Sequence, residues 1–485
     1  MSDVITLANE IVKEKERIRV AINNRGVNLS ASAPFSEYAS KIPLIASQVS
    51  DGDYYWKDTP YDDSQTSYTV PGNYDVIDDS AFSSKTNLQS INLNNVRYIG
   101  NDALLGCTSL TSFIADHVFK IGDNVLCGCS SLTSLNNTSA KIIGNNFLCG
   151  CPITTLRLSA ERIGANVNPN NSELSSIDLT GVKEIGSGAF FNCDHLNTII
   201  APDLEKIGSS AFAYINNWNY SFDQSTISLS FPKLKIVGLN AFYGVKGLES
   251  IDMPNVEIIE ENAFEYTGSN DGRITNVNVP KCRYIGGNAF HHRYTSGSST
   301  TDTILDSLTI ADGCELIDAC LYCAPITVNG KIGAIHLIHD GNCMSFAHSN
   351  GIVFNIDFSG LHTITSKYGG VSYVFSGHSN SHGLCFNGAI DLKNLLLIEH
   401  YSNSNPIRIF DIVNYNYYGI SKVWINKDLI ITNPNHTELL CSLSSDTHIY
   451  TDADAKQSSW TNVGGSGTWH FGCSHQDFEN GIYNL

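Results

Sequence analysis

An isoleucine–glycine pair, or a close variant of it, recurs through most of the chain at nearly constant intervals. Its first residue stands at Ile77, Ile99, Ile121, Ile143, Ile163, Ile185, Ile207, Val237, Ile259, Ile285 and Ile317. The successive spacings are 22, 22, 22, 20, 22, 22, 30, 22, 26 and 32 residues. A register held this long does not arise by chance. It predicts a solenoid, in which each unit buries its apolar edge against the next.

A second segment, of the form Leu-x-x-Ile-x-Leu, follows eleven residues after the isoleucine at Leu88, Leu174 and Leu248, and recurs at Leu305 within the longest spacing. Its alternation predicts a short strand with two side chains pointing inward. The Ile-Gly pair is expected to form a corner, with glycine supplying backbone freedom. An Ala-Phe pair, four and five residues after the isoleucine, is expected to form a short helical turn. The sequence therefore predicts an α/β solenoid of about 22 residues per repeat, with one short parallel strand per repeat in one continuous sheet over roughly 70–440.

The charge balance restricts the possible partners. The chain has 29 basic and 48 acidic residues, a net charge of −19, which repels phosphate backbones and anionic membranes. We therefore expect no nucleic-acid partner, and no apolar run approaches the ~20 residues of a membrane span. The first residues lack the basic and apolar regions of a secretory signal, so we expect the protein to leave its cell by another way, such as lysis.

The cysteines and carboxylates offer candidate chemistry that their spacing disfavours. Cys107, Cys129, Cys151 and Cys193 each stand eight residues after the isoleucine, which predicts a stacked column of buried, reduced thiols. The set Cys320, Cys323, His336 and His339 is one residue short of zinc-finger spacing, so we expect no metal and no cofactor. Four aspartates occupy outward strand positions, where carboxylate pairs can hydrolyse glycans but are more often solvated. They are Asp178, Asp252, Asp357 and Asp391.

The whole unit resembles a known repeat family. Its pattern, Cys-x-x-Leu-x-x-Ile-x-Leu-Pro followed by Leu-x-x-Ile-Gly-x-x-Ala-Phe-x-x-Cys, is similar to the BspA-type, or treponemal-type, leucine-rich repeat over residues 70–325. Proline rarely closes the strand, although Pro254 and Pro280 do, and Asn168 interrupts the Ala-Phe pair of the fifth unit. Members of that family are non-enzymatic surface or binding proteins. The resemblance implies that this chain is not an enzyme either.

The two ends differ from the regular array. Residues 1–47 predict a helical module for anchoring and oligomerisation, and their sequence resembles a short element of bacteriophage tail and tail-fibre proteins; a generic helical cap is the alternative. Residues 48–69 predict a linker, and residues 326–440 predict irregular repeats with insertions. Residues 441–485 resemble the C-terminal cap of BspA-type arrays, with Trp460 near its centre.

These features favour a non-enzymatic phage virion protein, a tail fibre or receptor-binding component made in the host cytoplasm. Its expected partners are a host surface receptor, either glycan or protein, and other tail proteins through the N-terminal module. A homo-oligomer is expected, and the resemblance to fibres implies a trimer. The alternative is a BspA-like adhesin at the surface of a bacterium or protist.

The three long spacings locate the expected binding surface. The extra residues all enter between the Ala-Phe pair and the next strand, so they should emerge on one edge of the solenoid. Neutral variation in tolerant loops is an equally weighted alternative. The aromatic and polar residues of these insertions are the binding candidates: Trp218, Tyr220, Tyr266, Arg273, His291, His292, Arg293 and Tyr294.

Overall fold

The computed structural model describes residues 61–480 except 73, 136–138, 217–226, 228, 268–273, 292–304, 319, 322–326, 339–341, 347–352, 355, 369–371, 378–384, 387, 403–404, 406, 412–419, 440–446 and 461–466. The expected helical module at 1–47 lies outside these residues. Residues 61–69, expected to belong to a linker, form part of the first coil instead. Their strand β1 (Ser67–Thr69) pairs with β3 (Ser90–Asn92), and Tyr61 is buried.

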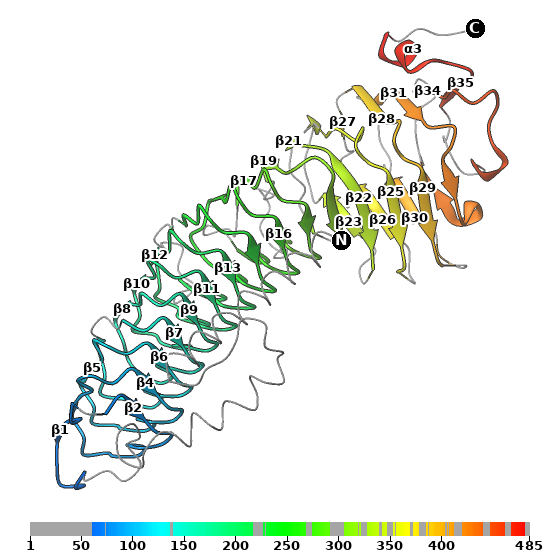
Figure 1. Ribbon diagram of the computed structural model, residues 1–485. Helices are drawn as coiled ribbons and strands as arrows, with labels where there is room; N and C mark the ends of the chain where they lie inside the picture. Colours follow the sequence, from blue (N-terminus) through cyan, green and yellow to red (C-terminus); the bar gives the residue numbers. More distant parts are fainter. Residues whose placement is uncertain are drawn as a thin grey trace, which may run out of the picture.

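One sheet of fifteen parallel strands, called here the long sheet, runs the length of the array (Figure 1). The Ile-Gly segments build it, since each isoleucine pairs with that of the next coil. Its strands are β2 (Val76–Ile77), β4 (Tyr98–Ile99), β6 (Lys120–Ile121), β7 (Ile142–Ile143), β9 (Arg162–Ile163), β11 (Glu184–Ile185), β13 (Lys206–Ile207), β14 (Ile236–Val237), β16 (Ile258–Ile259), β18 (Tyr284–Ile285), β20 (Cys314–Ile317), β22 (Ile332–Leu337), β25 (Thr363–Ser366), β29 (Leu397–His400) and β32 (Ile430–Ile431).

The Leu-x-x-Ile-x-Leu segments also form parallel strands, which fall into three sheets over the described residues. Ile91, Ile177 and Ile251 lie one in each of these sheets. The two coils between these sheets contain residues outside that description, 136–138 and 228, so one continuous sheet stays a prediction there. The three sheets are β1, β3 and β5 (Ser112–Ile114); β8 (Thr155–Arg157), β10 (Ser176–Asp178) and β12 (Thr198–Ile200); and β15 (Ser250–Asp252), β17 (Asn276–Asn278), β19 (Ser307–Thr309) and β21 (Thr327–Asn329).

Close approach between coils explains the glycine that follows each isoleucine. A Cβ atom on Gly122 would lie 2.7 Å from the carbonyl carbon of Gly100, and one on Gly186 would lie 2.4 Å from that of Gly164. Neither Gly122 nor Gly186 has a positive φ. Backbone freedom at a corner, the expected reason, is therefore not the cause: only hydrogen fits between the stacked backbones. The register also corrects one repeat assignment, because Leu316 and not Ile317 pairs with Ile285.

Turns, not helical turns, follow the glycines, so the described repeats are built of strands and turns rather than α/β units. Their N–H groups bond to the next coil, as Phe82 does to the Ala103 carbonyl at 2.7 Å and Phe190 to that of Ala211 at 2.8 Å. The third residue after the isoleucine is left-handed and is mostly asparagine, which tolerates this conformation best after glycine. The Asn124 amide donates to Asp102 at 2.8 Å, and Asn146 donates to Asn124 at 2.8 Å.

A continuous apolar core fills the array. Five phenylalanines stack in it with centroids 5.1–5.6 Å apart: Phe190, Phe212, Phe242, Phe264 and Phe290. The predicted column of buried, unpaired cysteines is confirmed. Each thiol also donates to a carbonyl of the preceding coil, as Cys193 does to Asn168 at 3.1 Å and Cys151 to Leu126 at 3.0 Å. At the same position, the Thr267 hydroxyl donates to the Phe242 carbonyl.

This shared contact gives a test of what the cysteine column does. Cys193→Thr is expected to keep the bond that Thr267 makes naturally. Cys193→Val removes the donor and should lower the free energy of unfolding by about 1 kcal/mol relative to threonine. Urea unfolding of the full chain under reducing conditions measures the difference. Equal stability of the two variants would mean that the thiol is only an apolar filler.

Alternating charges line the outer face of the long sheet. Parallel strands in register place equivalent positions side by side, where like charges would repel. Lys183 lies 3.6 Å from Glu161, Lys235 lies 2.7 Å from Glu205, and in the adjacent column Arg162 lies 2.6 Å from Glu184. The alternation runs through seven consecutive coils: Lys141, Glu161, Lys183, Glu205, Lys235, Glu257 and Arg283.

Beyond residue 326 each coil gains further strands. Ile364 pairs with Ile398, which confirms the expected order of the decayed repeats. The intervening stretches, predicted as insertions, contain two more parallel sheets and a two-stranded pair (Figure 1). These are β23 (Asn342–Phe346), β26 (Ser372–Gly377), β30 (Ile407–Asp411) and β33 (Thr437–Glu438); β28 (Gly388–Leu392), β31 (Ile420–Ile425), β34 (His448–Tyr450) and β35 (Thr468–His470); and β24 (Val353–Phe354) with β27 (Cys385–Phe386).

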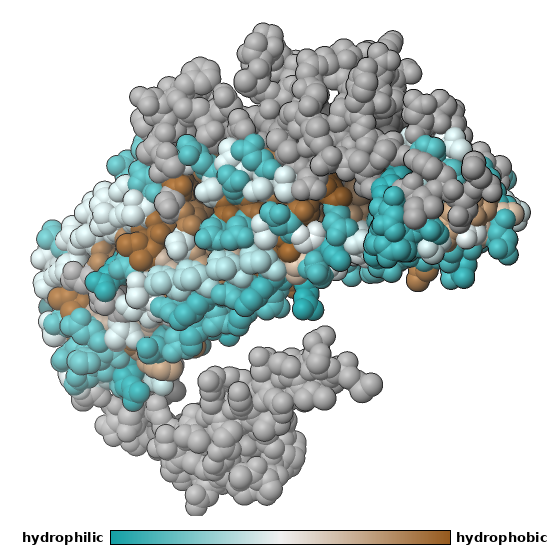
Figure 2. Space-filling model, turned by 90° about the horizontal axis from the view of Figure 1, so that it is seen from above, coloured by the Kyte–Doolittle hydropathy of each residue, from teal (hydrophilic) through white to brown (hydrophobic). Residues whose placement is uncertain are grey.

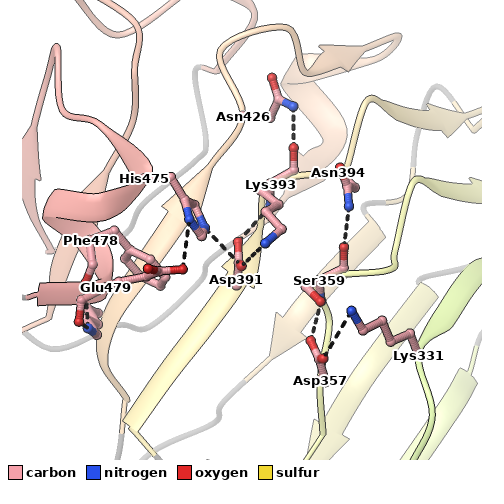
Figure 3. A network of polar contacts seen from close by, with 11 residues as sticks. Lys331, Asp357, Ser359, Asp391, Lys393, Asn394, Asn426, His475, Phe478 and Glu479 are labelled. Atoms are coloured by element: carbon pink, nitrogen blue, oxygen red, sulfur yellow. Dashed lines mark hydrogen bonds and ion pairs between the residues drawn. The ribbon is translucent and has the colours of Figure 1, made fainter. Parts of the chain in front are cut away.

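The C-terminal segment closes over this part of the array. Besides the single-turn helices η1 (Pro434–His436) and η2 (Ser458–Trp460), it contains α3 (His475–Asn480). The Phe478 ring packs on Trp424 and Tyr450 at 5.9 and 5.7 Å, and His475 contacts Asp391 at 3.0 Å (Figure 3). Trp460, from the predicted cap, is fully buried. Within the described part of the chain, no helix has the length and apolar character needed to cross a membrane.

Candidate binding surface

A row of half-buried rings lies beside the phenylalanine stack, one ring from each of five consecutive coils. This aromatic row consists of Phe191, Tyr214, Tyr243, Tyr266 and His291. Successive ring centroids are 5.7, 5.2, 5.3 and 5.9 Å apart, at interplanar angles of 90°, 67°, 90° and 51°. Such edge-to-face contacts are favourable, so the rings hold one another in place.

Local sequence produces the alternating orientation of the rings. In the coils of Phe191, Tyr243 and His291, the ring directly follows the stacked phenylalanine; in those of Tyr214 and Tyr266 it comes one residue later. Both of these tyrosines are left-handed, with φ of 59° and 55°. That conformation is uncommon for a bulky residue and costs roughly 1–2 kcal/mol. The same position is left-handed in the other described coils, from Ser84 to Gly244, so the repeat itself imposes this conformation.

A carboxylate–imidazole pair ends the row. His291 Nδ1 lies 2.9 Å from Glu265 Oε1, and the two side chains are only 21% and 12% exposed. Burial, and after it the Glu265 carboxylate, raises the pKa of the Tyr243 hydroxyl. The tyrosine therefore stays protonated and can act as a hydrogen-bond donor. The row thus combines apolar ring surface with a hydroxyl, a carboxylate and an imidazole.

The structure brings two of the predicted binding residues, Tyr266 and His291, into contact in this row. The other six, Trp218, Tyr220, Arg273, His292, Arg293 and Tyr294, lie outside the described residues. The three insertions, as read from the sequence, begin at Tyr214, Tyr266 and His291, which are themselves rings of the row, so their starting points share one edge.

The sequence interpretation missed four members of this surface. They are Phe191, Tyr214, Tyr243 and Glu265. A signal was present: an aromatic residue or histidine comes one or two positions after the stacked phenylalanine in five successive units. The equivalent positions of the five preceding coils hold other residue types, namely Ser83, Leu105, Cys127, Cys149 and Pro169.

The outward aspartates are engaged in turns and ion pairs rather than arranged as an acid–base pair. Burial pushes the pKa of Asp178 up, but hydrogen bonds from Thr180 and the charge of Arg157 outweigh it, and the net pKa is lowered. The pKa of Asp357 is lowered in the same way, by hydrogen bonds from Ser359. A general acid needs a raised pKa. Asp391 pairs with Lys393 and His475 (Figure 3), and Asp252 accepts from Asn278 at 2.7 Å.

The zinc-like cysteine and histidine set is only partly described. Cys320 is buried and His336 lies in β22, while Cys323 and His339 fall outside the described residues. Among the residues that the structure covers, no group of three or more histidine, cysteine or acidic side chains is placed to hold a metal ion.

A second surface is the face of the long sheet. A shallow groove of about 470 Å³ crosses strands β7 to β14 and is lined in part by Ile142, Arg162, Glu184 and Lys206. Its opposite charges satisfy one another across neighbouring strands, so it presents no single sign of charge to a partner. The surface of the array is also of mixed polarity elsewhere: hydrophilic and hydrophobic bands run side by side along the described coils in Figure 2.

The coils are stacked in parallel and are about 22 residues long. Each contains a leucine-rich strand and a second strand that belongs to the long sheet, and this arrangement defines a leucine-rich-repeat solenoid. The family described as BspA type leucine rich repeat region matches residues 60–175, 106–219 and 215–309, which together span just over half of the 485 residues. The chain belongs to this family, as its sequence predicted.

Three solved structures are similar to this chain. A leucine-rich repeat protein of T. pallidum is 22% identical, with 34% of this chain and 83% of that chain covered and a TM-score of 0.30. One from Bacteroides ovatus ATCC 8483 is 17% identical over 79% and 92%, with a TM-score of 0.35. A leucine-rich cell surface protein of Faecalibacterium prausnitzii A2-165 is 15% identical over 65% and 89%, with a TM-score of 0.30. No curated protein matches the sequence.

Proposed function

We propose that this protein is a non-enzymatic binding protein and that the aromatic row is its recognition surface. One observation carries the proposal: the row occurs in five consecutive coils and coincides with the starting points of the insertions. The buried phenylalanines already fill the core of these coils. Partly exposed tyrosines beside a carboxylate and an imidazole suit the recognition of a ligand with both apolar and hydrogen-bonding groups.

The more specific proposal is a phage tail fibre or receptor-binding protein. The resemblance of residues 1–47 to phage tail modules supports it. In this role the N-terminal residues join the protein to other tail proteins and to copies of itself, and the row meets a glycan or protein receptor on the host. Membership of the BspA-type family favours the second candidate, an adhesin displayed at a cell surface.

The double variant Tyr243→Ala/Tyr266→Ala tests the recognition surface. Each ring lost from the centre of a binding surface costs roughly 1–2 kcal/mol or more, so affinity should fall at least tenfold. The measurement is retention of labelled full-length protein on a panel of bacterial cells and on their extracted envelope polysaccharides and proteins. Circular dichroism checks that the array still folds.

Tyr98→Ala/Phe119→Ala is the matched control. These rings also touch, with centroids 6.1 Å apart, but Tyr98 lies in β4 of the long sheet and Phe119 directly precedes β6. The control should bind like the wild type. Unchanged binding by the Tyr243/Tyr266 variant would refute the proposed surface, and loss in the control alone would transfer the site to the long sheet.

The phage and adhesin roles are separated by where the protein is found. Mass spectrometry of purified particles should detect it at a fixed ratio to other tail proteins if it is a virion component. Surface labelling of intact, unlysed cells should detect it if it is an adhesin. The identity of neighbouring genes, encoding tail proteins or not, provides an independent check.

A further inference from the structure

Two half-buried thiols occupy equivalent positions in neighbouring coils. Cys127 and Cys149 each stand six residues after the isoleucine of their unit. The glycines that follow them, Gly128 and Gly150, are left-handed, with φ of 77° and 75°. The Gly128 N–H donates to the Cys149 carbonyl at 2.7 Å, and a Cβ atom on Gly150 would lie 3.8 Å from the Gly128 Cα.

These contacts place the two backbones side by side next to the thiols. Paired parallel chains are about 4.7–4.9 Å apart. A disulfide joins residues whose Cα atoms are about 4.4–6.8 Å apart. The Cα separation of paired chains therefore falls within the range that a disulfide requires.

A nearby pair provides an internal comparison. Cys129 and Cys151 are 0% and 2% exposed, and their thiols donate to carbonyls of the preceding coil. Solvent and reagents can reach Cys127 and Cys149 but not this second pair. The two pairs share the same coils and differ in access, which makes one a candidate for modification and the other its control.

We infer that Cys127 and Cys149 form a reversible disulfide that ties two neighbouring coils together when the protein meets a small-molecule disulfide. One thiol gives its proton to solvent, and its thiolate attacks a sulfur of the reagent and releases one reagent thiolate. The second cysteine, also deprotonated, then attacks the mixed disulfide and releases the other reagent thiolate. Two protein thiols are oxidised, and the reagent is reduced to two thiols.

The surroundings set the conditions of this reaction. Burial, and after it the neighbouring Cys149, raises the pKa of the Cys127 thiol to about 11. The reactive thiolate is therefore scarce at neutral pH, and its fraction rises about tenfold per pH unit below that value. The pair stays reduced in a reducing cytoplasm and closes only slowly after the protein reaches an oxidising environment.

The test incubates the reduced full-length protein with oxidised glutathione at several pH values. Free thiols are then blocked, and the products are mapped by peptide mass spectrometry. We expect a cross-link between the peptides of Cys127 and Cys149, formed about tenfold faster at pH 8.5 than at pH 7.5. Cys129 and Cys151 should react with the blocking reagent only after denaturation.

Variants distinguish the cross-link from other thiol reactions. Cys127→Ser should leave Cys149 carrying one glutathione, whereas Cys129→Ser should retain the cross-link. The inference fails if the wild-type protein carries glutathione on both residues without a cross-link. It also fails if neither residue reacts, or if the cross-link joins either residue to a different cysteine.

Discussion

Alanine at position 286 should destabilise the array, whereas alanine at the adjacent position 287 should leave its stability nearly unchanged. A Cβ atom on Gly286 would lie 2.5 Å from the Glu261 nitrogen and 2.7 Å from the Glu260 carbonyl carbon, both backbone atoms of the preceding coil. On Gly287 the nearest atom is the Asp318 Cβ at 3.4 Å, an ordinary contact. Neither glycine has a positive φ, so close packing alone separates the two variants.

The expected loss for Gly286→Ala is about 1–3 kcal/mol, the usual range for overpacking, and its upper end is expected because backbone atoms cannot rotate away. Urea unfolding followed by circular dichroism gives the free energy of unfolding of both variants. Equal stability would mean that adjacent coils can separate without cost, and the stacked-backbone explanation of the glycine column would be wrong.

Removal of one ring from the phenylalanine stack should have the largest effect on stability. Phe242 is fully buried between Phe212 and Phe264, with centroids 5.5 and 5.1 Å away. Phe242→Ala leaves a cavity that the neighbouring coils cannot fill, and the expected cost is about 3–5 kcal/mol. Because each coil is stabilised only by its neighbours, the loss should also allow the coils on either side to unfold earlier.

Tyr243→Ala is the matched comparison, since Tyr243 is adjacent in sequence but only half-buried. Its cost should be well below that of Phe242→Ala, because solvent and the neighbouring rings can occupy part of the vacated space. Denaturant unfolding and limited proteolysis measure both variants. A Tyr243→Ala variant as unstable as Phe242→Ala would make the aromatic row a structural element first and would weaken its assignment as a binding surface.

The period of the sequence was sufficient to predict the solenoid, its family and the buried cysteine column. The period did not identify the segment that makes the long sheet, because a strand of two residues is too short to show the alternation of apolar and polar residues that predicts a strand. The Ala-Phe segments were predicted as helical turns from local pattern. Their N–H groups bond instead to a coil about 22 residues away, as Phe82 does to Ala103, and no local propensity encodes that contact.

The candidate surface was predicted in part for a similar reason. Tyr266 and His291 were found because they border long spacings. Tyr243 was missed because its role depends on contact with rings in other coils. Tyr214 borders a long spacing too, but only Trp218 and Tyr220 of that insertion were selected. Glu265 was missed because its carboxylate becomes distinctive only through burial beside His291. Between residues 326 and 440, strands were similarly interpreted as insertions, since their partners lie in other coils.

The alternating charges of the long sheet limit how an array of this kind can gain or lose coils. Deletion of the coil that carries Lys183 would set Glu161 beside Glu205, two like charges in adjacent strands. Deletion of two coils would instead set Glu161 beside Lys235 and keep an opposite pair. The same rule applies to duplication: adding an even number of coils keeps opposite charges side by side, whereas adding an odd number does not. Between residues 141 and 283, unequal exchange between repeats is therefore expected to be tolerated in even steps, so that lineages of this chain differ by two coils more readily than by one.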